Sequence, residues 1–215
     1  MKNHYLIIFF LVFVSHLDIY GQDSLKTKFP FFIHAGSGVG FNTLNSNQAK
    51  DELAHLVSTS FRIGIESEIS KGWLVGLTIY RNEFLVSKAS GNYGENGGAG
   101  FFVNRIFQPN ARQSFYGSIG LGYSGLVFEN YMNASMINSK GKSSGVYACF
   151  GIGYRKIYDS GFGIFAQLDN SIYRYFSLRI EPDDGPKEEI AKWKMEIQSL
   201  DLRVGLLYGF DKKKQ

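Results

Sequence analysis

Residues 200–210 alternate, apart from Leu207, between apolar side chains and side chains that are charged or absent. Successive side chains of a β-strand point to opposite faces, so one face of this segment would be apolar and the other would carry Asp201, Arg203 and two glycines. Eleven residues are enough for a tilted strand to cross a bilayer, and Tyr208 and Phe210 stand where a membrane interface would lie. The segment therefore predicts a transmembrane strand with an apolar outer face.

The same alternation recurs along the rest of the chain. The further segments are 31–41, 59–69, 73–80, 99–104, 115–124, 146–155 and 162–172. Between the segments lie long polar stretches at 42–57, 81–97, 130–142 and 174–194, and short turns at 70–72, 107–113 and 158–161. This regular change of long and short connections is typical of outer-membrane barrels. The pattern predicts an all-β fold, an eight-stranded antiparallel up-and-down transmembrane β-barrel.

Two of the long polar stretches allow a prediction of their secondary structure. Pro182 stands in a run of prolines and acidic residues, which argues against a strand at 181–186. Residues 187–194 are instead compatible with a helical turn, as is part of 42–57.

The first residues have the order of a secretory signal. Lys2 and His4 precede an apolar run at 5–14, and Gly21 offers a small residue for cleavage before Gln22. The run is too short to span a bilayer as a helix; an uncleaved anchor is the alternative. We expect a signal peptide at 1–21, a barrel domain at 22–215, and export to the cell outer membrane.

Composition agrees with a barrel and excludes several other classes. A mean hydropathy of -0.12 is too low for a helical membrane protein, whereas the spans of a barrel are only half apolar. The single cysteine, Cys149, cannot form an internal disulfide. The net charge of +4 lies partly in the exposed lysines 212–214, so no nucleic-acid partner is inferred.

The inward faces of the predicted strands carry charges of both signs interleaved with glycine. We expect a lumen charge network formed by Arg62, Glu66, Glu68, Arg155, Asp169, Asp201 and Arg203. Eight strands enclose a space that side chains can fill, and buried charges must pair. Arg62, Glu66, Asp201 and Arg203 are the leading candidates, because the first and last strands become neighbours on closure. A gated solute path is the alternative to a plugged lumen.

Aromatic residues gather at two levels, as in the interfacial girdles of membrane proteins. The girdle at the short turns is predicted to include Trp73, Phe115, Tyr154, Phe162, Tyr208 and Phe210. At the other level the sequence places Tyr123, Tyr131, Tyr175 and Trp193.

On these features the chain resembles the small outer-membrane β-barrel family of Gram-negative bacteria, the porin-like or OmpA-like eight-stranded barrels. Residues 206–210 look like the C-terminal signal read by the barrel assembly machinery, although 211–215 follow the final aromatic. The resemblance implies outer-membrane lipids, lipopolysaccharide and that machinery as partners. A soluble periplasmic lipocalin-like lipid-binding barrel is the alternative, but water-facing strands would not favour so many of the 25 glycines.

Residues suited to catalysis or metal binding are few. In the mature chain the histidines are His34 and His55, and Ser58 and Ser60 lie near His55 without a nucleophile motif. One cysteine and two scattered histidines form no ligand cluster. We expect a monomeric, non-enzymatic protein with a structural or porin-like role, and with no catalytic, cofactor-binding or metal site. Surface adhesion or ligand binding through the long loops is the alternative.

Overall fold

The computed structural model describes residues 30–46, 56–85, 93–109, 111–129, 139–182, 188–190 and 194–210. Within these ranges the chain forms nine antiparallel strands. They are β1 Phe31–Ser46, β2 Leu56–Ser70, β3 Trp73–Leu85, β4 Tyr93–Ile106, β5 Gln113–Glu129, β6 Ser139–Ile157, β7 Phe162–Pro182, β8 Glu188–Ile190 and β9 Met195–Phe210. The described ranges contain no helix long and apolar enough to cross a membrane. The expected signal peptide at 1–21 lies outside the described residues.

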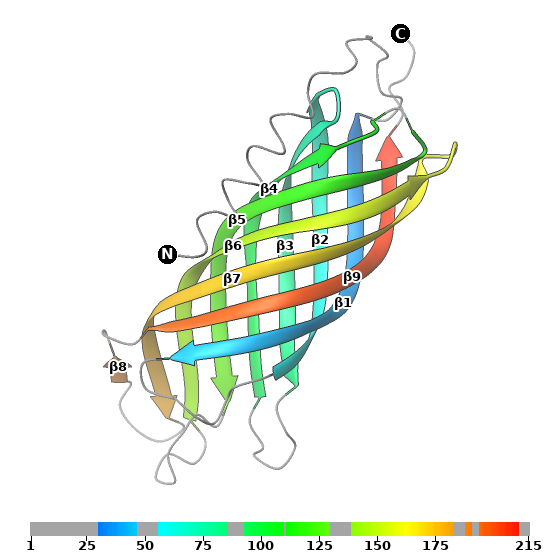
Figure 1. The fold of residues 1–215 in the computed structure, drawn as a ribbon. Helices are drawn as coiled ribbons and strands as arrows, with labels where there is room; N and C mark the ends of the chain where they lie inside the picture. Colours follow the sequence, from blue (N-terminus) through cyan, green and yellow to red (C-terminus); the bar gives the residue numbers. More distant parts are fainter. Residues whose placement is uncertain are drawn as a thin grey trace, which may run out of the picture.

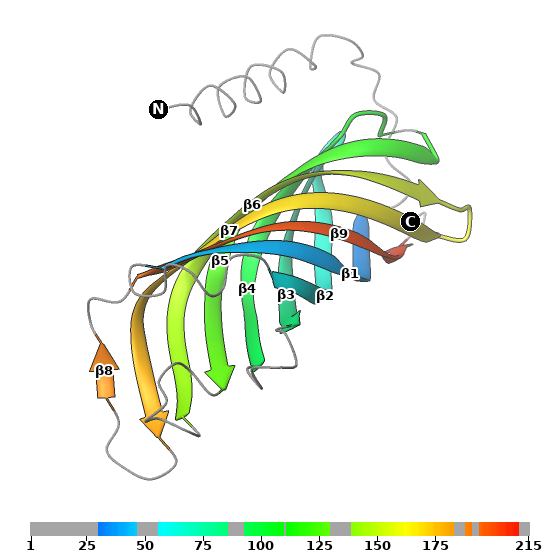
Figure 2. The ribbon, with the colours of Figure 1, turned by 60° about the horizontal axis from the view of Figure 1, so that its bottom comes forward.

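The sheet closes on itself to form a barrel (Figures 1 and 2). Strands β1 to β7 each pair with the next strand, β7 pairs with β9, and β9 pairs with β1 from Phe31↔Phe210 to Ser46↔Met195. The short strand β8 lies outside the ring and pairs with the end of β7. The predicted eight-stranded up-and-down barrel is therefore confirmed.

The two rims differ in their connections. The rim that holds the start of β1 and the end of β9, called here the short-turn rim, also carries the turns after β2, β4 and β6. Gly72 and Gly161 adopt positive φ angles of 76° and 86° in these turns, a conformation that glycine accepts without strain. The opposite, long-connection rim holds the strand ends joined through 47–55, 86–92, 130–138 and 183–194.

Several strands are longer than predicted at the long-connection rim. β7 runs to Pro182, so the expectation of no strand at 181–186 was wrong for Glu181 and Pro182. Pro182 is tolerated because it is the last residue of the strand, where a missing N–H costs little. The expected helical turn at 187–194 was also wrong for Glu188–Ile190, which form β8.

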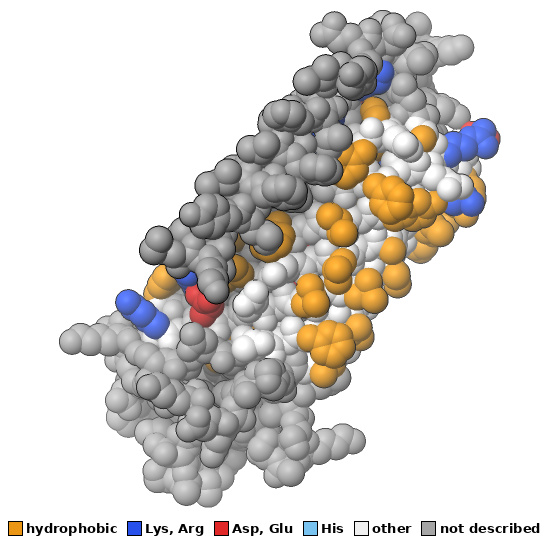
Figure 3. All heavy atoms as spheres, viewed as in Figure 1, with side chains coloured by type: hydrophobic (Ala, Val, Ile, Leu, Met, Phe, Trp, Pro, Cys, Tyr) orange, Lys and Arg blue, Asp and Glu red, His pale blue; other side chains and the backbone are white. Residues whose placement is uncertain are grey.

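The two faces of the barrel wall have inverted polarity compared with a soluble protein. Outward positions carry large apolar side chains that are widely exposed, such as Phe101 at 72%, Leu121 at 63% and Val204 at 61%. Inward positions carry glycine, tyrosine and buried polar groups such as Asp169 and Arg203. Figure 3 shows hydrophobic side chains over the visible wall, with charged side chains near its two ends.

Candidate functional site

The lumen at the short-turn rim is filled by an apolar layer. This rim layer consists of Phe32, Leu74, Ile106, Tyr116 and Leu207, with Ile157 and Phe165 packed against it. Its members are placed there because each occupies an inward position close to a short turn or a chain end. The rim layer separates the middle of the lumen from the short-turn side.

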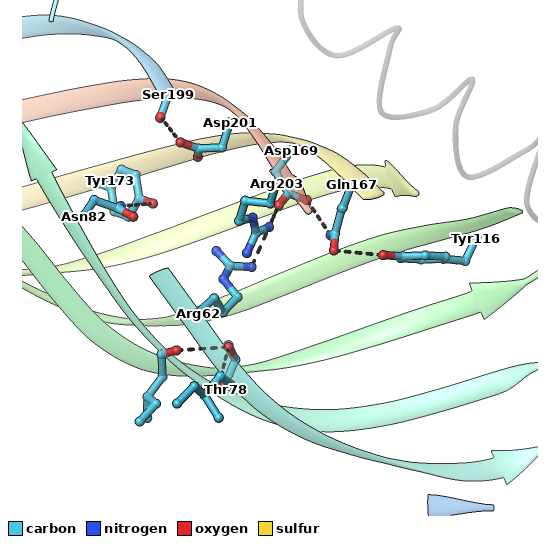
Figure 4. A network of polar contacts seen from close by, with 12 residues as sticks. Arg62, Thr78, Asn82, Tyr116, Gln167, Asp169, Tyr173, Ser199, Asp201 and Arg203 are labelled. Atoms are coloured by element: carbon cyan, nitrogen blue, oxygen red, sulfur yellow. Dashed lines mark hydrogen bonds and ion pairs between the residues drawn. The ribbon is translucent and has the colours of Figure 1, made fainter. Parts of the chain in front are cut away.

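Ionised side chains meet in the middle of the lumen, in a charged layer of Arg62, Glu66, Arg155, Asp169 and Arg203. Arg203 forms an ion pair with Asp169 Oδ2, and Arg62 Nη1 lies 4.0 Å from the same oxygen (Figure 4). Arg155 Nη1 lies 4.0 Å from Glu66 Oε1. Asp169 is fully buried and the other side chains are nearly so, which makes pairing necessary.

Neutral donors complete the contacts of the two acids. Gln167 Nε2 donates to Asp169 Oδ1 over 2.7 Å, and Tyr116 donates to Gln167 Oε1 over 3.1 Å (Figure 4). Asn104 Nδ2 donates to Glu66 Oε2 over 2.7 Å. The charged layer is thus tied to the rim layer through Tyr116.

The pairing differs from the sequence expectation. Asp201, a leading candidate, accepts a hydrogen bond from Ser199 Oγ at 2.8 Å and lies in no ion pair within 4.0 Å among the described side chains. Its place is taken by Asp169, because β7 lies directly beside β9. Glu68 lies at the short-turn rim, where its Oε1 accepts the backbone N–H of Gly72 at 3.0 Å.

An aromatic layer fills the lumen towards the long-connection rim. Its members are Tyr80, Phe84, Leu126, Tyr147, Cys149, Tyr173, Tyr175, Leu178, Met195 and Ile197. The Tyr80 ring lies 4.8 Å from that of Tyr147 and 5.9 Å from that of Tyr173, between ring centroids. Asn82 and Asn96 donate hydrogen bonds to Tyr173 and Tyr175, over 3.1 and 3.2 Å. The middle of the lumen is therefore bounded by packed side chains on both sides.

Tyr175 was predicted to face outward in a girdle, and this was wrong, because it is 1% exposed and belongs to the aromatic layer. The reason is that β7 extends past this residue, and its alternation places Tyr175 on the same inward face as Tyr173. Tyr123, predicted at the same level, does face outward and is 56% exposed. Tyr131 and Trp193 lie outside the described residues.

Aromatic side chains line the outer wall at the short-turn rim. Phe115 contacts Tyr154 and Phe210 contacts Tyr208, at 5.3 and 5.0 Å between ring centroids. Phe162 is the ladder partner of Tyr208. Trp73 is half-buried, with the Arg105 guanidinium 5.0 Å from its ring. All six residues of the predicted girdle thus occupy outward positions near this rim.

Comparison with solved structures agrees with the geometry. No protein-family model matches the sequence, and no curated protein sequence matches it. Neisserial surface protein A is similar, with a TM-score of 0.53 and 14% identity over 84% of this chain and 97% of that one. A major outer membrane protein from Thermus thermophilus has a TM-score of 0.52 and 13% identity over 84% of this chain and 99% of that one.

A third similar structure is the outer membrane protein OprG from Pseudomonas aeruginosa, with a TM-score of 0.50 and 13% identity over 86% of this chain and 98% of that one. Together with the closed sheet and the apolar outer wall, these likenesses decide the fold. The chain has the fold of the small outer-membrane β-barrels. Identities of this size show the outer-membrane barrel fold alone.

Cross-strand ion pairs mark the end of the apolar band on the outer wall of the barrel. The band covers the outward positions from the short-turn rim to Leu200 on β9 and Val146 on β6. Beyond it, Arg174 Nε lies 2.8 Å from Glu196 Oε2 and Arg81 Nη2 lies 2.6 Å from Glu95 Oε2. Lys142 Nζ pairs with Glu181 Oε2 at 2.5 Å. The strands therefore continue past the apolar band with a charged outer face.

Of the residues considered for catalysis, His34 and Ser58 lie at inward positions on the strands of the barrel. The His34 ring lies between those of Phe102 and Phe165, at 5.5 and 5.9 Å between centroids. Ser58 is buried and accepts a hydrogen bond from Asn42 Nδ2 at 2.8 Å. His55 lies outside the described residues. Among those that are described, no three His, Cys, Asp or Glu side chains gather to hold a metal ion.

The inward glycines provide the room that the charged layer needs. A Cβ added at Gly151 would overlap the Asp169 carboxylate. Gly151→Ala is expected to lower the free energy of unfolding by about 1–3 kcal/mol, because the carboxylate must move away from Arg203. The change in the free energy of unfolding is measured by urea titration, with gel mobility used to distinguish folded from unfolded protein. Gly125→Ala is the control, since the nearest atom to its new Cβ lies 3.8 Å away; equal effects would contradict the steric account.

Proposed function

We propose that this chain is an integral outer-membrane β-barrel with a structural, porin-like and non-enzymatic role and with a lumen closed by side chains. The observation that carries the proposal is the inverted wall, apolar outside and charged inside, on a closed barrel fold. Exposed apolar surface of this extent would be unfavourable in water and is favourable in lipid. A soluble lipocalin-like barrel requires the opposite arrangement of the two faces.

The filled lumen supports a role that does not depend on passing solutes. The rim layer and the aromatic layer both pack to low exposure, with the charged layer between them. Space for water in the middle of the lumen amounts to about 40 Å³, which is enough for only a few water molecules. We propose at most small and transient conductance.

The absence of enzymatic activity is part of the proposal. His34 lines the middle of the lumen, where its ring packs between those of Phe102 and Phe165. General base catalysis needs a base within hydrogen-bond reach of the proton that it removes. We therefore assign no catalytic role to His34.

A second candidate function is surface adhesion or ligand binding through the connections at the long-connection rim. It is favoured by the length of β6 and β7, which continue past the ion pairs that end the apolar band. In this proposal, β6 and β7 extend beyond the bilayer surface and hold the connections of the long-connection rim away from it. Loss of a whole-cell binding phenotype on replacing 183–187 by a glycine–serine linker would support it.

The proposal is tested by comparing unboiled and boiled samples of the outer-membrane fraction in mild SDS. A closed barrel keeps every strand paired and should migrate as a compact species until it is heated. We also expect the mature protein to begin at Gln22 by mass spectrometry. Recovery of unshifted protein from the soluble periplasm would overturn the proposal, and long-lived large openings in planar bilayers would overturn the closed lumen.

A further inference from the structure

The outer wall carries an apolar groove over β2 to β5. The groove consists of two adjoining depressions, of about 540 and 380 Å³, and Ile65, Leu77 and Phe101 line both of them. The larger depression reaches Ala99 on β4, a small outward residue beside Tyr123 on β5. The smaller one continues towards the short-turn rim. A concave and mainly apolar surface of this kind is suited to a hydrocarbon ligand.

The groove runs over the thickness of one leaflet of a bilayer. Arg105 lies six positions after Ala99 on β4, which is about 20 Å along a strand. At the tilt of about 40° that is usual for strands of membrane barrels, this length covers about 15 Å along the bilayer normal. The hydrocarbon core is about 30 Å thick. A chain in the groove therefore belongs to the leaflet at the short-turn rim.

Cationic side chains stand at the short-turn end of the groove. Val75 and Val103 line the smaller depression, and the next outward pair on the same two strands is Trp73 and Arg105. The Arg105 guanidinium lies 5.0 Å from the Trp73 ring, and its Nη1 donates to the backbone oxygen of Lys71 over 3.0 Å. These contacts hold the guanidinium at the turn between β2 and β3, to which Lys71 adds its own ammonium group.

The charge at this turn is complementary to a phosphate. Glu68, the acid of the same turn, occupies an inward position, and its Oε1 accepts the backbone N–H of Gly72 over 3.0 Å. Together with Lys71 and Arg105 it leaves a net charge of +1. Tryptophan is enriched at the level of lipid headgroups, so Trp73 indicates that these cations lie at that level. Guanidinium and ammonium groups form charge-assisted hydrogen bonds with phosphate oxygens.

We propose that the groove and these two cations form a binding site for one anionic phospholipid of the leaflet at the short-turn rim. An acyl chain lies along the groove as far as Ala99, and the phosphate lies against Arg105 and Lys71. This inference rests on the proposed function, because the occupant of the groove comes from a bilayer. A zwitterionic phospholipid with the same chains carries no net charge, so the charge of the headgroup distinguishes the two lipids.

The test measures which lipid lies beside Trp73. The mature protein carries Trp193→Phe, which leaves Trp73 as the single tryptophan of a chain that has 2. It is folded into phosphatidylcholine vesicles with a small fixed fraction of phosphatidylglycerol or phosphatidylcholine whose acyl chains are brominated near the headgroup. Bromine quenches tryptophan fluorescence only at short range. Each cation should favour phosphatidylglycerol about fivefold, so this lipid should quench more strongly; equal quenching would overturn the proposal.

Three variants locate the site, and a fourth is the control. Arg105→Gln and Lys71→Gln should each lower the preference for phosphatidylglycerol about fivefold, and Lys71→Gln decides if Arg105→Gln fails to fold. Ala99→Phe fills the far end of the groove and should weaken the preference although both cations remain. Arg112→Gln removes an exposed cation from another short turn and should retain the preference. An equal loss in Arg112→Gln, or no loss in the other three variants, would show general attraction to anionic lipid and overturn the site.

Failure of the site and failure of the barrel proposal give different results. Each protein is also compared unboiled and boiled in mild SDS. A retained heat-dependent shift without a preference for phosphatidylglycerol would overturn the phospholipid site alone. Absence of the shift in the unsubstituted protein would overturn the membrane barrel itself.

Discussion

Replacing Asp169 with alanine is expected to lower the free energy of unfolding by about 3–5 kcal/mol, the usual result of removing one partner of a buried ion pair. Asp169 is fully buried, and it balances Arg203 directly and Arg62 at 4.0 Å. Without it, two guanidinium groups remain in the lumen with no nearby acid on β7. The loss is measured in detergent as the shift in the urea concentration at which half of the compact species, seen on gels of unboiled samples, has disappeared.

The matched control is Asp159→Ala, which also breaks an aspartate–arginine pair. Asp159 pairs with Arg112 at 2.8 Å, but both side chains are more than 70% exposed. Pairs of this kind contribute little, so the change should stay within about 0.5 kcal/mol. Equal effects of the two substitutions would mean that the charged layer does not stabilise the barrel.

Placing arginine at the centre of the apolar band is expected to have the second-largest effect. Val204 is an outward residue of β9 and lies near the middle of 200–210. In a bilayer, Val204→Arg should cost about 2–4 kcal/mol, because the charge must be desolvated or must reach back to the interface. Reversible urea unfolding in phospholipid vesicles measures the difference from the unsubstituted protein.

Gln198→Arg is the control on the same strand. Gln198 also faces outward, but it lies beyond the apolar band, next to the position of Glu196. The expected cost there falls to about 0–1 kcal/mol. If Val204→Arg cost no more than Gln198→Arg, the wall would face water and the membrane assignment would be wrong.

The strands inside the apolar band could be predicted from sequence because two different environments act on alternate residues. Along 200–210, each outward residue is apolar and each inward residue is charged or is glycine, except Leu207. Leu207 breaks the rule because it belongs to the rim layer. Eight such segments, joined by alternating long and short connections, were enough to predict the closed topology.

The same reasoning failed where the outer face becomes polar. From 139 to 145 and from 174 to 182 the outward side chains include Lys142, Arg174 and Glu181, so hydrophobic alternation disappears although the strands continue. In addition, β7 bulges where Ser144↔Ser177 is followed by Gly145↔Tyr175, so that Phe176 is an extra residue. A bulge reverses the faces beyond it and leaves no compositional signal.

The pairing of charges could not be predicted because it depends on register. The sequence placed Arg203 and Asp169 on inward faces, and the barrel topology makes their strands neighbours. Only the ladder, with Gln167↔Arg203 and Asp169↔Asp201, shows that Arg203 reaches Asp169 while Asp201 turns to Ser199. Residues 183–194, which connect β7 and β9 in the sequence, show no hydrophobic alternation from which this register could be predicted.

The pairing of β1 with β9 has a consequence for the order of assembly. The first and last strands meet along their whole length, so the ring can close only after the final strand has been synthesised. Contacts between such distant parts of a chain form slowly. Arg203 is part of β9, so it joins the lumen only when this last strand pairs. Before that step, Asp169 and Arg62 can remain hydrated. The step that completes the hydrogen-bonded ring is therefore also the step that removes the central charges from water.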